Sequence, residues 1–206
     1  MTETLRFGDL DIAFDHTVLR PRPWTLEQSR WAADLAAQAP PGPVLELCSG
    51  AGHIGLAFVR LSLRPLVMVD ANGSACAIAR ANAAAAGCAE RVDVRHGDMR
   101  EVLGGGERFA FAIADPPYLR SADTSRYPED PLTAVDGGAD GLALVRVCLD
   151  VLDRHLLAGG GAVLQVLDRA QADAVTAFLG TGAGARLEVA GVRVVDGHGA
   201  LVHLRG

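Results

Sequence analysis

The chain has 206 residues, 50% of them hydrophobic, and a formal net charge of −6. This composition supplies a full hydrophobic core for one domain and excludes a largely disordered chain. The negative charge and the absence of a local cluster of basic residues disfavour a protein that holds a long stretch of nucleic acid. No segment resembles a membrane span, and the first residues lack the pattern of a signal peptide, so we expect a cytoplasmic protein.

Neither the cysteines nor the histidines form a pattern typical of a metal site. The four cysteines lie far apart without a C-x-x-C pair, which predicts reduced, mostly buried thiols and no metal ion. The six histidines are equally scattered, and most are expected on the surface or in the core. His53 is the exception that merits a test, because it directly follows a glycine-rich loop.

The first part of the chain predicts an arm followed by a helix. Apolar and polar residues partly alternate within residues 5–19, as in a short hairpin. Two prolines then fix an extended segment, and a helix is expected up to about Gln38. We therefore expect residues 1–39 to form an arm and a helix that pack on a main domain of residues 40–206.

A glycine-rich loop lies between a predicted strand at residues 44–47 and a predicted helix at 53–62. The loop consists of Cys48, Ser49, Gly50, Ala51 and Gly52. Glycines let the backbone approach a ligand closely, and the helix that follows offers unpaired N–H groups, so a nucleotide-like ligand fits this place. The three-glycine pattern, which Gly55 completes, is weak by itself, because a tight turn between strand and helix explains it equally well.

Asp70 ends the next predicted strand, at residues 66–70. A carboxylate at the end of the second strand of a βαβ unit can accept hydrogen bonds from both hydroxyl groups of a ribose. The alternative is that Asp70 caps the helix beginning near Gly73, and the two roles are compatible.

The rest of the chain continues the alternation of strands and helices. Further strands are predicted at residues 91–96, 109–114, 162–167, 186–195 and 200–204, and further helices at 75–86, 142–157 and 170–179. Three consecutive glycines at 159–161 are expected to separate the helix at 142–157 from the next strand. Residues 119–139 form a long polar segment, which is typical of a functional loop.

This order of elements predicts an α/β fold. We expect a doubly wound, mostly parallel seven-stranded sheet of the Rossmann-like type, with an antiparallel hairpin at its C-terminal end. Ligands of such sheets bind at the carboxyl ends of the strands. Cys48, Asp70, Asp98 and Asp115 all follow or end predicted strands there.

Two cofactors suit a glycine turn with an acid after the second strand: a dinucleotide and S-adenosylmethionine. A dehydrogenase would need residues for hydride transfer and usually a substrate domain, and we find neither in the sequence. A series of acids favours S-adenosylmethionine, with Glu46 just before the loop, Asp70 for the ribose and Asp98 near the adenine.

The sequence Asp115-Pro116-Pro117-Tyr118 follows the strand at 109–114. Two prolines make a rigid bend, which leaves the Asp115 carboxylate and the Pro116 carbonyl as acceptors for the two hydrogens of a planar NH₂ group. Tyr118 is placed to stack on a flat methyl acceptor. The motif therefore predicts methyl transfer to nitrogen.

With these motifs the chain resembles class I S-adenosylmethionine-dependent methyltransferases of the HemK/PrmC type, which are glutamine N5-methyltransferases of peptide chain release factors. The resemblance covers nearly the whole chain, and its most family-specific segment is Asp136-Gly137-Gly138-x-Asp140-Gly141-Leu142. The predicted cofactor-binding residues are Glu46, Cys48, Ser49, Gly50, Ala51, Gly52, Asp70, Ala71, Asp98, Met99 and Asp115. The predicted catalytic residues are Asp115, Pro116, Pro117 and Tyr118.

The chain departs from this family at several points. Asp115 stands where the family usually has asparagine, and Asp-Pro-Pro-Tyr is more typical of enzymes that methylate exocyclic amines of nucleobases. Cys48 replaces the usual first glycine of the loop, and Arg20 and Trp24 replace the usual aliphatic and acidic residues. We also expect a chain without the N-terminal helical domain of the bacterial enzymes.

We therefore expect an S-adenosylmethionine-dependent N-methyltransferase that acts on a planar nitrogen of a protein or small-molecule acceptor, first of all a protein glutamine. A small metabolite and a nucleobase amine remain alternatives, with nucleic acid disfavoured by the net charge. An NAD-dependent oxidoreductase and a non-catalytic cofactor-binding module are more distant alternatives.

Overall fold

The computed structural model describes residues 2–183 and 186–206. Its strands are β1 (Glu3–Phe7), β2 (Leu10–Phe14), β3 (Val44–Leu47), β4 (Leu66–Asp70), β5 (Val92–His96), β6 (Phe109–Ala114), β7 (Leu156–Val166), β8 (Glu188–Val195) and β9 (Gly199–Arg205). Its α-helices are α1 (Leu26–Ala36), α2 (His53–Ser62), α3 (Gly73–Ala85), α4 (Leu132–Val135), α5 (Ala143–His155) and α6 (Arg169–Leu179).

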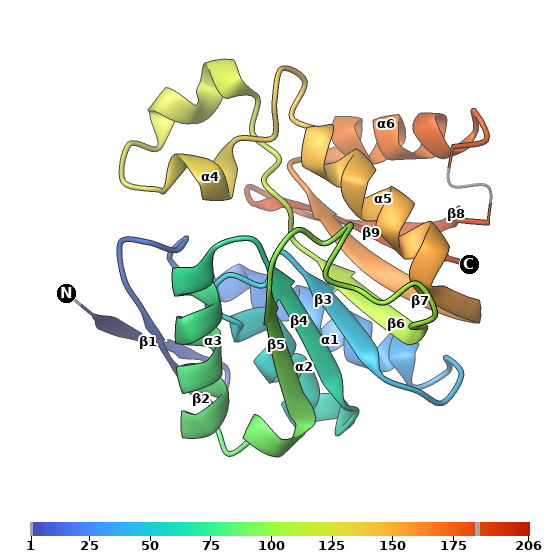
Figure 1. Ribbon diagram of the computed structural model, residues 1–206. Coiled ribbons are helices and arrows are strands. Elements are labelled where there is room, and N and C mark those ends of the chain that lie inside the picture. Colours follow the sequence, from blue (N-terminus) through green and yellow to red (C-terminus); the bar gives the residue numbers. More distant parts are fainter. Residues whose placement is uncertain (1, 184–185) are drawn as a thin grey trace.

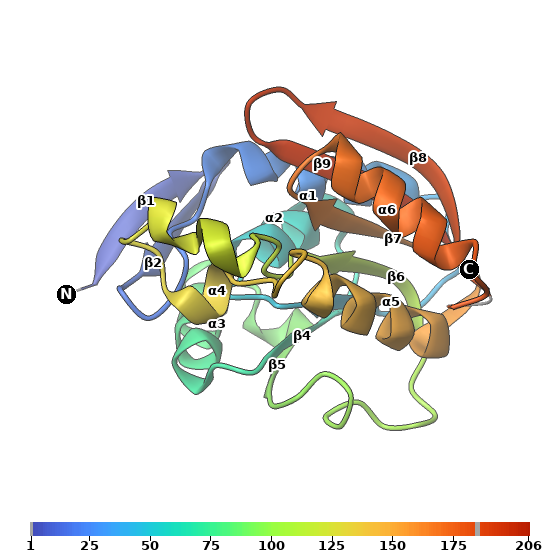
Figure 2. The same cartoon turned by 90° about the horizontal axis from the view of Figure 1, so that it is seen from above.

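Seven of these strands form one sheet in the order β5-β4-β3-β6-β7-β9-β8, with helices on both faces (Figures 1 and 2). Neighbours from β5 to β7 are parallel, and β9 runs antiparallel to both β7 and β8. The predicted fold class is confirmed. From β3 the chain winds outward to β4 and β5, then returns to β6 on the other side of β3, which makes a crevice for ligands at the carboxyl ends of β3 and β6.

Alternating side chains of the strands divide the core into two clusters. Helices α1, α2 and α3 cover one face, where Phe58 and Met68 are completely buried. Helices α5 and α6 cover the other, where Leu45 and Leu149 lie. The near-continuous apolar runs in β3, β4 and β6 follow from this, since each of these strands is covered on both faces.

The β1–β2 hairpin is a separate two-stranded sheet that packs on α3 (Figure 1). Phe7, Ile12 and Phe14 bury their side chains in the core cluster under α2 and α3. Asn82 of α3 accepts a hydrogen bond from the Ala13 N–H and donates one to the Ala13 carbonyl, both at 2.9 Å. The hairpin thus holds the following segment against the strand ends, while the division of the chain at residue 39 stays a prediction.

The structure corrects the predicted break at Gly159-Gly160-Gly161. Helix α5 ends at His155 and β7 begins at once, so the glycines lie inside the strand. A Cβ on Gly160 would lie 2.9 Å from the Ala110 carbonyl oxygen, and one on Gly161 would lie 2.9 Å from that of Leu204. The glycines therefore permit the close approach of neighbouring strands where the β6–β7 register shifts, rather than ending an element.

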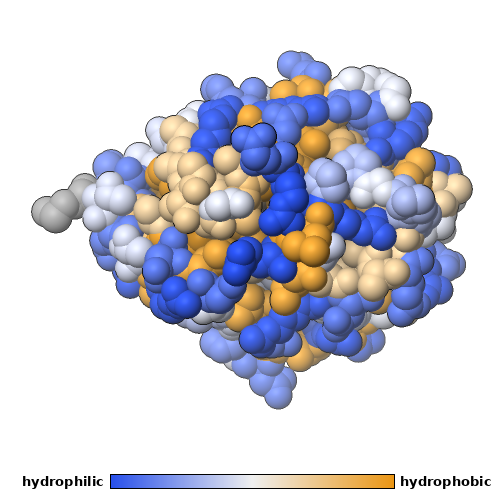
Figure 3. Space-filling model, turned by 90° about the horizontal axis from the view of Figure 1, so that it is seen from below, coloured by the Kyte–Doolittle hydropathy of each residue, from blue (hydrophilic) through white to orange (hydrophobic). Residues whose placement is uncertain are grey.

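The face seen from below, opposite the segment that carries α4, shows small hydrophobic groups among hydrophilic ones (Figure 3). Leu61 and Leu63, at the C-terminal end of α2, are among the exposed hydrophobic residues of the chain. Among the described residues, no helix is long and apolar enough to cross a membrane.

Candidate functional site

The glycine-rich loop turns sharply because three of its residues have left-handed backbone conformations. The φ angles are +58° at Cys48, +52° at Gly50 and +79° at Gly52. Such angles suit glycine and cost free energy at Cys48, which is not a glycine. The turn brings the N-terminus of α2 to the carboxyl end of β3, so the unpaired N–H groups of the helix face the crevice.

A first cavity of about 650 Å³ lies at this crevice. Among the predicted cofactor-binding residues, those that line it are Cys48, Ser49, Gly50, Ala51, Asp70, Ala71, Asp98, Met99 and Asp115. Its wall also includes residues that the sequence did not indicate, such as Leu19 from the arm and Thr133 from α4. The Ser49 hydroxyl is buried and has no hydrogen-bond partner among the described residues, which fits a wall built for a polar ligand.

Backbone N–H groups fix the Asp70 carboxylate at the rim of this cavity. It accepts hydrogen bonds from Gly50 N–H at 2.7 Å and Asn72 N–H at 2.8 Å. Burial raises the pKa of Asp70 from its ordinary value, with these bonds acting in the opposite direction. The alternative prediction, that Asp70 caps the next helix, is wrong: Asn72 is the N-cap of α3 and accepts from Ser74 N–H at 2.9 Å.

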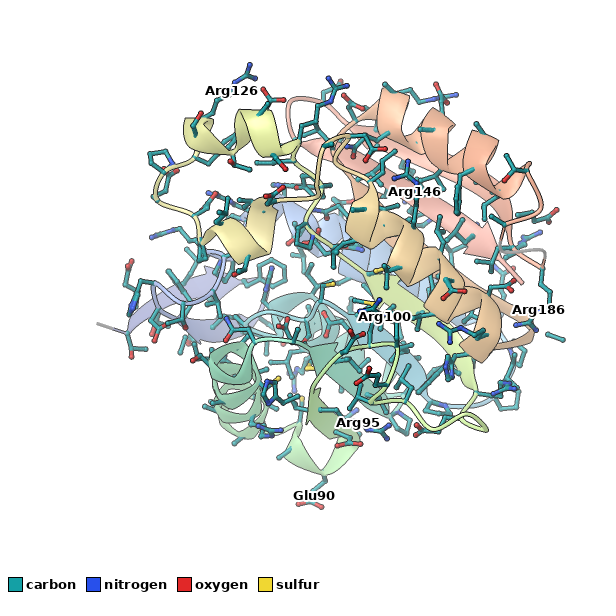
Figure 4. The ribbon with its side chains drawn as sticks, turned by 45° about the horizontal axis from the view of Figure 1, so that its top comes forward. Glu90, Arg95, Arg100, Arg126, Arg146 and Arg186 are labelled. Atoms are coloured by element: carbon teal, nitrogen blue, oxygen red, sulfur yellow. The ribbon has the colours of Figure 1, made fainter. Side chains whose placement is uncertain are left out.

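Asp98 forms an ion pair with Arg100, which is labelled in Figure 4, where the chain leaves β5. Both residues line the first cavity. The Arg100 guanidinium donates to the Asp98 carboxylate at 2.9 Å and lowers the pKa of Asp98 to about 2. Asp98 is therefore ionised at neutral pH and already paired.

Two predicted cofactor-binding residues, Glu46 and Gly52, do not line the cavity. Glu46 is 2% exposed, and its carboxyl accepts a hydrogen bond from Gly55 N–H at 2.9 Å. A Cβ on Gly55 would collide with the Glu46 carboxyl, so the third glycine of the pattern is needed for contact between β3 and α2. Glu46 thus joins the strand to the helix, and burial raises its pKa to about 8.

Glu46→Gln is expected to change how stability depends on pH. The folded chain keeps Glu46 protonated up to about pH 8, whereas the unfolded chain releases the proton near its ordinary value of 4.5. Wild-type stability therefore falls as pH rises through this interval. The glutamine keeps an acceptor for Gly55 and has no proton to lose, so its free energy of unfolding relative to wild type rises by up to about 1.4 kcal/mol per pH unit. Urea unfolding at several pH values in this interval measures the free energy of unfolding of both proteins. The same dependence on pH in wild type and Glu46→Gln would refute the raised pKa of Glu46.

A second cavity, of about 440 Å³, adjoins the first and is lined by all four predicted catalytic residues. Asp115 and Pro117 line both cavities, so the motif stands where the two meet. Burial raises the pKa of Asp115 to about 7 and raises that of Tyr118 as well. Asp115 therefore changes charge near neutral pH, as suits a group that accepts a proton there.

Distant parts of the chain close the second cavity. Trp24 stacks on His198 from the β8–β9 turn, with ring centroids 5.6 Å apart and an angle of 7° between the planes. Arg22 pairs at 2.7 Å with Asp130 from the segment before α4. The segment at 119–139 is thus not a structureless loop: it contains a 3₁₀ helix at Ser121–Arg126, from which Arg126 points outward (Figure 4), and α4.

The Asp136-Gly137-Gly138 segment packs on the backbone of the catalytic motif. A Cβ on Gly137 would lie 2.7 Å from the Pro117 carbonyl oxygen, and one on Gly141 would collide with that of Tyr118. Asp136 accepts hydrogen bonds from the Ser121 hydroxyl and from Gly138 N–H. Gly137 and Gly141 are therefore required, because a side chain at either position would collide with the backbone of the motif.

Three buried glutamines that the sequence analysis missed also fix the motif. The Gln28 amide donates to the Ala114 carbonyl at 3.0 Å, and the Gln171 amide donates to the Tyr118 carbonyl at 2.9 Å. The Gln165 amide donates to the Tyr118 hydroxyl at 3.3 Å. The sequence did carry a signal for these residues. Gln165 interrupts an apolar strand, and Gln28 and Gln171 lie on the buried faces of helices. His53 is buried as well and lines both cavities, and burial lowers its pKa to about 4.

The comparisons with known proteins agree with this geometry. Residues 32–129 match the model of the family described as "Methyltransferase small domain". The chain is 33% identical over 170 residues to the release factor glutamine methyltransferase of Gloeobacter violaceus, covering 80% of this chain and 59% of the relative. It is 30% identical to that of Thermosynechococcus vestitus, covering 92% and 67%. The ribosomal protein uL3 glutamine methyltransferase of Bradyrhizobium diazoefficiens is 33% identical, with 60% and 40% covered. The chain thus spans about three fifths of the length of the first of these relatives.

Among solved structures, the fold is similar to a ribosomal protein L11 methylase from Lactobacillus delbrueckii, with a TM-score of 0.66 and 14% identity. That match covers 91% of this chain and 80% of the methylase. It is also similar to the glycopeptide N-methyltransferase MtfA in complex with S-adenosylmethionine, with a TM-score of 0.59, 16% identity and coverage of 85% and 86%.

Proposed function

Because the chain belongs to the release factor glutamine methyltransferase family of class I methyltransferases, we propose that it transfers a methyl group from S-adenosylmethionine to the side-chain nitrogen of a protein glutamine. The observation that carries this proposal is the position of Asp115-Pro116-Pro117-Tyr118 where two cavities meet. One cavity has the features of a nucleotide site, and the other is large enough for a side chain.

The first cavity would hold the cofactor. S-adenosylmethionine supplies an electrophilic methyl group when it is bound. Asp70 would accept hydrogen bonds from the ribose hydroxyls, since each carboxylate oxygen has a lone pair left beside its backbone bond. The loop residues from Cys48 to Ala51 let the ligand approach the backbone, and the unpaired Ser49 hydroxyl offers it a hydrogen-bonding group.

The second cavity would hold the acceptor. Asp115 and the Pro116 carbonyl would accept the two hydrogens of the NH₂ group and so aim its nitrogen at the first cavity, while Tyr118 packs on the flat amide. As the new N–C bond forms, the nitrogen must lose a proton. Asp115 is the group to accept it, because its raised pKa makes the carboxylate a better base than an ordinary aspartate.

A protein acceptor is supported by the exposed rim of the second cavity. Tyr127, which lines it, is 40% exposed, and so presents a large aromatic side chain both to the cavity and to solvent. Such a residue suits contact with a polypeptide chain on either side of a bound glutamine. A nucleobase amine is a second candidate, because Trp24 and His198 provide a stacking surface and the motif begins with aspartate.

Incubation of the purified enzyme with labelled cofactor and cell fractions tests the proposal. We expect label in the protein fraction, incorporated about 10²–10³-fold more slowly when Asp115→Ala replaces the wild type. Label confined to nucleic acid or to small molecules would overturn the proposed acceptor. Calorimetry with S-adenosylhomocysteine tests the cofactor independently, and the absence of saturable binding would refute it.

A further inference from the structure

Gln165 lies on β7, and its side chain points out of the sheet on the face that α1 covers. Its neighbours Leu164 and Val166 belong to the core cluster on the opposite face. Gln165 itself is 1% exposed and lines the second cavity. A polar residue at this position interrupts the apolar strand, so its hydrogen bonds must be accounted for.

Only half of this carboxamide has a partner within residues 2–183 and 186–206. The Nε2 group donates to the Tyr118 hydroxyl at 3.3 Å, whereas Oε1 is buried without a hydrogen-bond donor. Gln171 differs, because its Nε2 donates to the Tyr118 carbonyl and its Oε1 accepts from Leu167 N–H. Gln171 is therefore satisfied by the fold alone, while Gln165 retains an acceptor beside the cavity.

The bond from Gln165 also orients the Tyr118 hydroxyl. A hydroxyl that accepts a hydrogen bond directs its own proton elsewhere, and the described residues supply no acceptor for the Tyr118 proton. Burial raises the pKa of Tyr118, so this proton stays on the oxygen at neutral pH. The wall of the second cavity thus includes Gln165, whose Oε1 is an unpaired acceptor, and Tyr118, whose hydroxyl is a donor.

On the basis of the proposed function, we propose that Gln165 determines specificity for an amide acceptor. Asp115 and the Pro116 carbonyl take both hydrogens of the side-chain NH₂ group, so Gln165 Oε1 accepts a hydrogen bond from the main-chain N–H of the bound glutamine residue. Gln165 Nε2 holds Tyr118 so that its hydroxyl donates to the side-chain carbonyl oxygen of that residue, which is the group that distinguishes an amide side chain. An alkyl amine has no carbonyl oxygen and would leave the Tyr118 hydroxyl unpaired.

Two substitutions separate recognition from packing. Gln165→Met keeps the shape and removes both hydrogen-bonding groups, whereas Gln165→Glu keeps an oxygen acceptor in the cavity. Gln38→Met, which makes the same chemical change at an exposed position after α1, is the matched control. With the unmethylated acceptor protein as substrate, we expect Gln165→Met to raise the KM for the acceptor about 10-fold or more, with kcat much less affected.

We expect Gln165→Glu to recover only part of this loss, because it keeps the acceptor oxygen and lacks the Nε2 donor that orients Tyr118. Calorimetric binding of S-adenosylhomocysteine should be unchanged in both variants, because Gln165 does not line the first cavity. Equal KM values for Gln165→Met and wild type would overturn the proposal. Equal impairment of the methionine and glutamate variants would also overturn it, because the acceptor oxygen that only the glutamate variant keeps would then contribute nothing to recognition.

A binding measurement keeps this inference separate from the proposed function. Trp24 lines the second cavity, so in a Trp31→Phe background its fluorescence reports on ligands there. N-acetylglutamine amide is the probe, and N-acetylornithine amide, whose side chain ends in an alkyl amine, is its control. We expect quenching by the glutamine probe that Gln165→Met abolishes. This result upholds the inference even if no protein is methylated, and equal responses to the two probes would overturn it.

Discussion

Replacing Asp115 with alanine is expected to lower kcat/KM for methyl transfer about 10²–10³-fold. The carboxylate stands where the two cavities meet, and the substitution removes both an acceptor that orients the nitrogen and the base that takes its proton. Calorimetric binding of S-adenosylhomocysteine should change little, because that product lacks the positive charge of the sulfonium. A variant that binds this product normally and still methylates at the wild-type rate would refute the assigned role.

The raised pKa of Asp115 adds a pH dependence to this expectation. If the ionised carboxylate takes the proton, wild-type kcat/KM rises with pH through about 7, where the group loses its own proton. A bound sulfonium favours the carboxylate, so the corresponding rise in kcat lies at lower pH. Asp115→Asn keeps one acceptor oxygen without a titrating group, and its activity should be lower and independent of pH in this interval. An unchanged pH profile in Asp115→Asn would exclude Asp115 as the base.

Replacing Asp70 with alanine is expected to weaken cofactor binding about 10–100-fold, since hydrogen bonds to a charged group each contribute roughly 1.5–3 kcal/mol. Gly50 N–H would also lose its partner, which loosens the glycine-rich loop. Calorimetry with S-adenosylhomocysteine measures the dissociation constant. Asp98→Ala is the matched comparison, because Asp98 is partly exposed and paired with Arg100, and its effect should be smaller. An equal or larger effect at Asp98 would contradict the assignment of Asp70 to the ribose.

The main elements of the fold were predictable because they depend on local patterns. The strands ending at Leu47, Asp70 and Ala114 are apolar runs followed by acids or glycines, and α2 was predicted at its observed bounds. A parallel strand covered on both faces must be apolar throughout, and its carboxyl end must face the crevice. Those two constraints placed Asp70 and Asp115 near a ligand before any side chain was located.

The remaining features depend on contacts between distant parts of the chain. The sequence does not show that Glu46 turns toward Gly55 and away from the crevice, because both directions are open to a residue before a glycine-rich loop. Gly160 was predicted to end an element, whereas glycine is required there by the nearby carbonyl of Ala110. Ala110 lies fifty residues earlier in the chain, so no local pattern shows this contact. The stacking of Trp24 on His198 likewise joins the arm to the last hairpin, and local periodicity carries no such information.

The most direct test of the account is to locate the methyl group on the product by mass spectrometry. We expect a single methyl group on the side-chain nitrogen of a glutamine in a protein, formed by the wild-type enzyme and about 10²–10³-fold more slowly by Asp115→Ala. A methyl group on any other atom of the protein, or on a nucleobase, would contradict it.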